Sequence, residues 1–381
     1  MRRTALLSAL LLLATTVACR PGGDRSLDAA AGTPTDDSIR RVAIDSTAAE
    51  AAADSTVVTT TAAATPAVPG AAPGAAPAPV AGDPAATPDS AAVVTPAAGA
   101  KPAAVKRPLV WPAPPTPLPG AHLPAERIVA FYGNPLTTRL GILGRIPPAQ
   151  MLDSLAKTAR AWQRADTTRA VRPALHLIAA VAAGHPGKDG KYRTRMSDAT
   201  IEQVAKWAEE HGWLMFVDLQ PGQSTVRDEL AWIKPWLARP YVHLALDPEF
   251  AMSRKPEGRR IPGKYIGTMD AADINEAQRV LAHLVDSLQL PPKVLVVHRF
   301  TDAMLTNAPQ IARDPRVQVV IDMDGFGSPA LKKGTWRRVI QREPVQYTGW
   351  KLFLNPKNDK PMMTPEQVLE MEPAPVYIQY Q

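Results

Sequence analysis

Aromatic side chains are confined to one part of this 381-residue chain, and their distribution limits where a folded domain can lie. All 21 of them (8 Trp, 7 Tyr and 6 Phe) occur at or after Trp111. A segment without aromatic residues cannot bury enough apolar surface to offset the entropy that folding costs. We therefore expect one folded domain over residues 111–381, preceded by a disordered linker over residues 19–110.

The first residues have the pattern of a secretory signal. Met1–Arg3 is basic, residues 5–14 are small or apolar, and small residues precede Cys19. This order is typical of a signal peptide, here expected over residues 1–18, and the apolar run is too short to span a bilayer comfortably. Cys19 stands where cleavage is expected, which resembles the bacterial lipoprotein signal. The resemblance implies a lipid anchor on Cys19 at the bacterial cell envelope; a plain signal peptide with an incidental cysteine is the alternative.

The segment between this signal and the folded domain is rich in Ala, Pro, Thr, Asp and Ser. Proline blocks helices, and no apolar periodicity appears, so we expect an extended tether. A wall-binding arm is the alternative, but the segment has no aromatic or cationic cluster. Cys19 is the single cysteine of the chain, which excludes a disulfide framework and a cysteine-based zinc cluster.

Eight short runs rich in Val, Ile, Leu and Phe alternate with longer amphipathic runs in the folded part. Ile274, Leu281 and Leu288, for example, share one face of a predicted helix. This alternation predicts a parallel sheet, and eight strands match an α/β fold of the (β/α)8 TIM-type barrel class whose last helix is missing. A doubly wound open sheet is the alternative, but no glycine-rich dinucleotide loop follows the first strand. The predicted strands are Arg127–Gly133, Ala174–Ala182, Trp213–Gln220, Val242–Phe250, Lys293–Phe300, Val317–Phe326, Trp350–Asn355 and Pro375–Gln381.

Polar side chains gather at the carboxyl ends of these strands, where barrels carry their functional sites. In strands three to six they alternate with apolar residues, so they share the face that is expected to point into the barrel. Unpaired buried carboxylates are costly, so these residues need partners, a substrate or a metal. His176 and His243, earlier in their strands, are expected to be core or lower-barrel residues. The candidates are Asp218, Gln220, Asp247, Glu249, His298, Arg299, Asp322 and Asp324, with Asn355 and Gln379 on the last two strands.

Several carboxylates on a barrel rim suit glycoside hydrolysis, in which one carboxyl group donates a proton and another acts as nucleophile, base or charge stabiliser. Asp247 and Glu249 are two residues apart, about 6.6 Å along a strand. Crowded like charges raise one pKa, which suits Glu249 as the general acid, assisted by Asp247 and Asp322. Asp324 is a further catalytic candidate, although it precedes a glycine and could simply form a turn.

The run Leu246-Asp247-Pro248-Glu249-Phe250 resembles the Asp-x-Glu at the end of strand four in Chalaropsis-type muramidases and chitinase-like barrels. The resemblance to barrel glycoside hydrolases implies that Glu249 is the acid, and that Asp322 matches an aspartate on strand six of the muramidases. The first strand departs from the muramidase pattern, because Asn134 ends it where those enzymes normally supply an aspartate.

The substrate expected from this pattern is a polysaccharide or a peptidoglycan-like polymer. The net charge of +7 lies wholly after residue 107, and basic loops at His185–Arg195 and Ser253–Lys264 could hold an anionic polymer or simply be solvated. Nucleic acid is not an expected partner of a secreted, anchored chain. The predicted substrate-binding residues are Tyr132, Asn134, Asp218, Gln220, His298, Arg299, Asn355 and Gln379, and Trp350 and Tyr380 are either further stacking residues or core.

Two other functions fit the same residues. A metal-dependent hydrolase or phosphodiesterase could hold a hard divalent ion, although no His-x-His or His-Glu-x-x-His motif supports zinc. The third possibility is a barrel that binds envelope glycan without catalysis. A glycoside hydrolase would need no cofactor and no metal. The metal ligands in the second case would be Asp218, Asp247, Glu249, His298 and Asp322.

Overall fold

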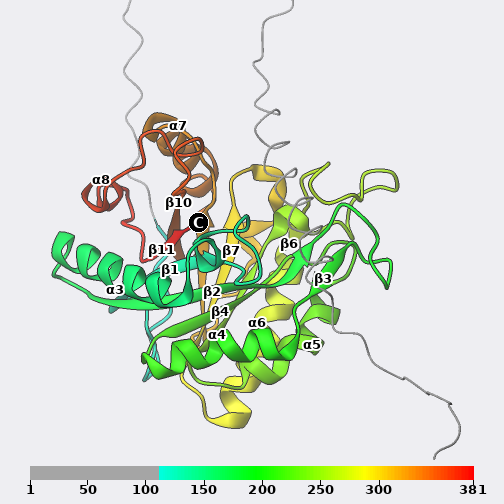
Figure 1. Cartoon of the computed structure of the whole chain (residues 1–381), viewed down its shortest axis with the longest axis horizontal. Helices are drawn as coiled ribbons and strands as arrows, with labels where there is room; N and C mark the ends of the chain where they lie inside the picture. Colours follow the sequence, from blue (N-terminus) through cyan, green and yellow to red (C-terminus); the bar gives the residue numbers. More distant parts are fainter. Residues whose placement is uncertain (1–110) are drawn as a thin grey trace, which may run out of the picture.

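The computed structural model describes residues 111–381, the part of the chain that is coloured in Figure 1. The predicted signal peptide, the lipid anchor at Cys19 and the linker over residues 19–110 lie outside the described residues. None of the helices within residues 111–381 combines the length and the apolar character that crossing a membrane requires.

Eight parallel strands close into a barrel at the centre of the molecule (Figure 1). Each strand pairs with the next, and β1 pairs with both the last strand and β2, which closes the sheet. The predicted (β/α)8 TIM-type barrel is confirmed, and each of the eight predicted runs overlaps a barrel strand. The barrel strands are β1 (Glu126–Gly133), β2 (Ala170–Ala182), β4 (Leu214–Leu219), β5 (Val242–Leu246), β7 (Lys293–Arg299), β9 (Val317–Met323), β10 (Tyr347–Leu352) and β11 (Tyr377–Tyr380).

Helices cover most of the outside of the barrel. The first four are α3 (Pro148–Ala165), α4 (Asp198–Glu210), α5 (Val226–Leu237) and α6 (Ala271–Leu288), and the short α2 (Ile142–Arg145) precedes them. α7 (Pro329–Thr335), its π-helical continuation η4 (Trp336–Ile340) and α8 (Pro365–Leu369) cover the later strands. Thr364 caps α8 in a capping box with Gln367. Only Gln381 follows β11, so no helix closes the described chain.

One crossover of the barrel contains no α-helix. The chain between β7 and β9 forms η2 (Asp302–Met304), β8 (Leu305–Thr306) and η3 (Ala308–Gln310) instead. Pro309 and Pro315 interrupt this stretch, which also lacks an apolar stripe at helical spacing. β8 pairs with the short strand β6 (Met269–Asp270), and β3 (Arg193–Arg195) pairs antiparallel with β2.

The two faces of the barrel strands separate as the alternation predicts. Phe216, Ala245, Val296 and Val320 belong to a cluster that fills the barrel interior. Their neighbours Met215, Leu244, Val297 and Ile321 belong to the larger cluster between the barrel and its helices. The same parity directs Asp218, His298 and Asp322 inward, where all three are fully buried.

Trp350 and Tyr380 belong to the outer layer and are core residues rather than sugar-stacking residues. Trp350 packs on Trp336 with ring centroids 5.4 Å apart. The hydroxyl of Tyr380 accepts a hydrogen bond from the indole nitrogen of Trp162.

Candidate active site

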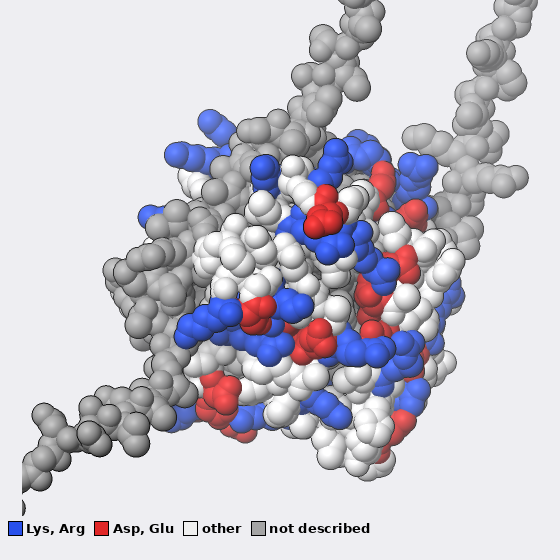
Figure 2. Space-filling view, turned by 90° about the vertical axis from the view of Figure 1, so that its right-hand side faces the viewer, with Lys and Arg blue, Asp and Glu red and all other residues white. Residues whose placement is uncertain are grey.

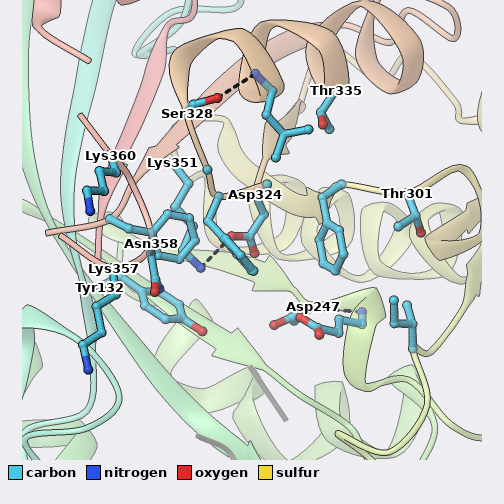
Figure 3. A pocket seen from close by; sticks show the side chains of 18 of the residues that line it. Tyr132, Asp247, Thr301, Asp324, Ser328, Thr335, Lys351, Lys357, Asn358 and Lys360 are labelled. Atoms are coloured by element: carbon cyan, nitrogen blue, oxygen red, sulfur yellow. Dashed lines mark hydrogen bonds and ion pairs between the residues drawn. The ribbon is translucent and has the colours of Figure 1, made fainter. Parts of the chain in front are cut away.

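A cavity of about 650 Å³ opens at the carboxyl ends of the barrel strands (Figure 3). Three carboxyl groups line it, together with Tyr132, Gln220 and Lys351. Its apolar lining comes largely from four phenylalanines, Phe250, Phe300, Phe326 and Phe353. A pocket of this size with convergent polar groups at this end of a barrel is the expected place for substrate.

Asp247 and Glu249 form one wall of the pocket. The strand ends at Leu246, earlier than predicted, because Pro248 has no N–H to donate and begins the 3₁₀ turn η1 (Pro248–Phe250). Asp247 caps this turn, since its Oδ1 accepts a hydrogen bond from the backbone N–H of Glu249 at 3.1 Å. The two acids are therefore joined by a tight turn rather than by extended strand, and Glu249 is the more exposed of the two.

Burial controls the protonation of Asp247, whose residue exposure is 2%. Burial raises the pKa of Asp247 to about 7, and His298 only partly opposes this rise. The other carboxylate oxygen of Asp247 accepts a hydrogen bond from Gln220 Nε2 at 3.3 Å. A substantial part of Asp247 is therefore protonated at neutral pH.

Asp324 lines the same pocket, but its carboxyl group is ionised. Its Oδ1 is 2.8 Å from Lys351 Nζ, and its Oδ2 is 3.1 Å from His298 Nδ1. Burial raises the pKa of Asp324, but Lys351 and His298 outweigh burial and hold it below its usual value. Lys351 Nζ also lies 4.3 Å from the centre of the Tyr132 ring, so the lysine bridges an anion and an aromatic face (Figure 3).

A second group of polar side chains lies under the pocket floor, inside the barrel. Asp218 Oδ2 is 3.4 Å from His298 Nε2 and 3.5 Å from His176 Nε2. On the other side of the His298 ring, Asp322 Oδ2 is 3.5 Å from Nδ1. His176 Nδ1 is 2.6 Å from the hydroxyl of Tyr377.

Charges alternate through this group. Burial lowers the pKa of His298, but Asp218 and Asp324 outweigh it and raise the pKa well above its usual value. Burial raises the pKa of Asp218, yet His298 and His176 bring it below its usual value. Burial raises the pKa of Asp322 to about 7 and lowers that of His176 to about 4. In this group a charged His298 therefore lies between the carboxylates of Asp218 and Asp324.

Three predicted site residues lie outside the pocket lining and are engaged by the chain itself. The Asn134 amide donates to the carbonyl of Ile178. Arg299 Nη2 lies 2.6 Å from Glu343 Oε2 and donates to the carbonyl of Leu305. Asn355 is exposed, and its side-chain oxygen accepts from the backbone N–H of Lys357 within a turn.

The remaining predicted residues divide between the pocket and the interior below it. The pocket receives Tyr132, Gln220, Asp247, Glu249 and Asp324. The buried interior receives Asp218, His298, Asp322 and Gln379. The five metal ligands predicted for the alternative function are thus split between two levels, whereas His176, Asp218 and His298 each bring one ligand atom within 4.8 Å of the others.

Two members of the polar site were not predicted from the sequence. His176 was expected to be a core or lower-barrel residue, but it lies at the centre of the buried polar group. Lys351 was not singled out, although a lysine inside the apolar run of the seventh strand was an available signal, because Trp350 and Leu352 on either side face outward.

Basic side chains line the pocket opposite Asp247. Lys357 and Lys360 lie on that side in Figure 3, and Arg338 of η4 also lines the cavity. All three are exposed, and none forms an ion pair with another residue of the described chain. They come from elements other than the two basic loops that the sequence indicated.

Several arginines of those two loops are neutralised by carboxylates. Arg193 and Arg195 both bind Glu229, at 2.9 and 2.8 Å, and Arg254 lies 2.7 Å from Asp273. Figure 2 shows basic and acidic side chains interleaved over one face of the molecule. Arg338, Lys357 and Lys360 at the pocket differ from these arginines, because no carboxylate of the described chain neutralises them.

Comparison with known proteins identifies no family for the chain and finds only weak structural similarities. No protein-family model matches the chain. No curated protein matches it either. Solved structures with some similarity include a ruminal GH26 endo-beta-1,4-mannanase, with a TM-score of 0.31 and 9% identity, covering 68% of this chain and 59% of the mannanase. A Podospora anserina GH26-CBM35 beta-(1,4)-mannanase has a TM-score of 0.29 and 9% identity, covering 59% of this chain and 54% of that one.

The chain thus matches less than two thirds of either mannanase. The barrel assignment stands on the strand pairing of the chain itself, since the TM-scores are too low to support more.

Proposed function

We propose that the chain is a glycoside hydrolase that cleaves a cell-envelope or extracellular polysaccharide. One observation carries this proposal: a single pocket contains a carboxyl group that burial keeps largely protonated, Asp247, and one that an ion pair with Lys351 keeps charged, Asp324. Two carboxyl groups in opposite protonation states are what acid-assisted cleavage of a glycosidic bond requires.

Glu249 is the proposed general acid, because it is the more exposed member of the Asp247–Glu249 turn and lines the pocket. It gives a proton to the leaving oxygen as the bond from that oxygen to the anomeric carbon breaks. Asp247, which is largely protonated, caps the turn that positions Glu249. Asp324 stabilises the positive charge that develops on the sugar ring. Water then supplies a hydroxyl group to the anomeric carbon, and its proton restores the acid.

Asp322 was predicted to assist directly, but it is fully buried and does not line the pocket. In this proposal Asp322 therefore acts only through His298, without touching substrate. The four phenylalanines supply apolar faces for sugar rings, and Thr301, Ser328 and Asn358 supply hydrogen-bonding groups for hydroxyls.

We further propose that the substrate carries negative charge, as an acidic polysaccharide or a peptidoglycan-like polymer does. Arg338, Lys357 and Lys360 support this, because three exposed cations that line one pocket favour an anionic group there. The carboxyl group of Asp247 lies opposite Lys357 and Lys360 in Figure 3, so an acidic sugar would bind with its charge directed away from the bond that is cleaved.

The proposed location is the bacterial cell envelope, with Cys19 as a lipid anchor and residues 20–110 as the tether. Metabolic labelling with a radioactive fatty acid tests this part. Incorporation that is lost in Cys19→Ser supports the anchor, and equal incorporation in both chains contradicts it.

The products released from acidic envelope polysaccharides by the full chain test the activity. A glycoside hydrolase releases oligosaccharides with new reducing ends, which mass spectrometry identifies by the water added to each. Release of phosphomonoesters instead would indicate a phosphodiesterase. Binding without any released product would indicate a glycan-binding barrel.

A further inference from the structure

We infer that His176, Asp218 and His298 form a binding site for one divalent transition-metal ion, with Zn²⁺ as the probe of choice. The three residues come from three barrel strands, β2, β4 and β7, and all are fully buried. None of them lines the pocket, so this site is distinct from the proposed catalytic site and does not depend on the proposed function.

The spacing of the three ligand atoms fits coordination better than hydrogen bonding. Asp218 Oδ2 is 3.4 Å from His298 Nε2 and 3.5 Å from His176 Nε2. These separations exceed the usual range of about 2.7–3.2 Å for N–H···O bonds. Ligands about 2.0–2.1 Å from a tetrahedral ion lie roughly 3.3–3.4 Å from one another, which is close to both separations.

Neither Nε2 atom, nor either oxygen of Asp218, makes a hydrogen bond with any of residues 111–381. Buried polar atoms without hydrogen bonds are costly, and here one such atom from each of the three residues lies within 4.8 Å of the other two. One cation bound between them would satisfy three side chains together. Imidazole nitrogen with one carboxylate is a ligand set that suits zinc and neighbouring transition metals.

The other ring nitrogen of each histidine lies near an oxygen, but only that of His176 makes a hydrogen bond to it. His176 Nδ1 is 2.6 Å from the Tyr377 hydroxyl, and His298 Nδ1 is 3.1 Å from Asp324 Oδ2. Metal-bound histidines typically donate their second N–H to such an oxygen, which fixes the ring and directs the free nitrogen toward the metal. His176 meets this condition through Tyr377, whereas His298 Nδ1 lies within ion-pair distance of Asp324 without a hydrogen bond to residues 111–381; both rings present Nε2 to Asp218.

The alternative to a bound metal ion is a protonated His298, which would form ion pairs with Asp218 and Asp324. That arrangement leaves His176 Nε2 without a hydrogen bond. A metal ion would instead join β2, β4 and β7 from the inside and stabilise the barrel under the pocket floor. Its role is structural, since none of its ligands reaches the cavity.

The test is the metal content and the thermal stability of the full chain. After incubation with Zn²⁺ and extensive dialysis, we expect about one ion per chain by mass spectrometry of the metal. Free Zn²⁺ at about 100 times Kd should raise Tm by roughly 5–10 °C. Asp218→Asn and His176→Gln should abolish both effects.

His243→Gln is the matched control, because His243 is also a fully buried barrel histidine and its Nε2 also makes no hydrogen bond with the described residues. It should retain the ion. A wild-type chain that keeps neither Zn²⁺ nor Mn²⁺ and shows no change in Tm would overturn the inference, even where a variant fails to fold. Neither readout uses catalysis, so a negative result here is separate from failure of the proposed hydrolase.

Discussion

Asp247 acquires its proton from burial rather than from crowding with Glu249. The sequence predicted that two neighbouring carboxylates would raise the pKa of Glu249, the outer one. In the structure the pKa of the inner residue, Asp247, rises, and burial is the largest cause. Residue spacing could predict that these acids belong together, but not which of them is buried, because Pro248 turns the chain between them.

The pH dependence of stability tests this protonation. The folded-state pKa of Asp247, about 7, exceeds the unfolded value of about 3.9, so its stabilising effect is full below pH 4 and is lost as pH rises through 7. Asp247→Asn should therefore gain about 2–4 kcal/mol relative to wild type between pH 4 and pH 8. Urea denaturation at both pH values measures the difference. A pH-independent effect of Asp247→Asn would contradict a raised pKa.

At the scale of elements, apolar runs predicted all eight strands, because a strand between a barrel core and a layer of helices must be apolar on both faces. Where the chain leaves the sheet was harder to predict. β5 stops at Leu246 because Pro248 and the cap by Asp247 begin a 3₁₀ turn, and the crossover after β7, which contains Pro309, also forms 3₁₀ turns. Hydrophobic periodicity predicts neither feature.

The start of α6 offers a test of such a cap. Asp270 Oδ1 accepts from the backbone N–H of Ala272, and its Oδ2 binds Thr306 and Asn307 at 2.6 and 2.7 Å. Asp270→Ala should lower the free energy of unfolding by roughly 1–2 kcal/mol, because it removes the cap and its link to β8. Chemical denaturation measures this. Asp198→Ala at the first position of α4, a helix that Ser197 caps, should cost clearly less; equal losses would contradict the capping role.

At the scale of the whole molecule, the site depends on how far each strand is staggered against its neighbours. His176 lies in the middle of β2, yet pairs in register with Tyr132 near the end of β1 and with Phe216 of β4. This stagger is a property of barrel closure, and no single strand carries a signal for it. For the same reason the contact between Lys351 and Tyr132 could not be predicted from either residue alone.

The charge at the pocket mouth should govern substrate choice. Removing Lys357 and Lys360 together, as Lys357→Ala/Lys360→Ala, should lower kcat/KM for an acidic polysaccharide roughly tenfold at low salt, with a smaller loss at high salt. A neutral polysaccharide should be little affected. The control is Lys188→Ala/Lys191→Ala, which removes two exposed cations from a loop outside the pocket. Equal losses in both double variants would contradict a specific anionic subsite.

The rate at which Glu249→Gln releases new reducing ends tests the central claim most directly. The amide keeps the shape of Glu249 but cannot give a proton to the leaving oxygen. We predict that the rate falls by at least about 100-fold while the fold and Tm are retained, and that Glu257→Gln, on an exposed loop, cleaves like wild type. A Glu249→Gln chain that cleaves the same polysaccharide at the wild-type rate would contradict the account.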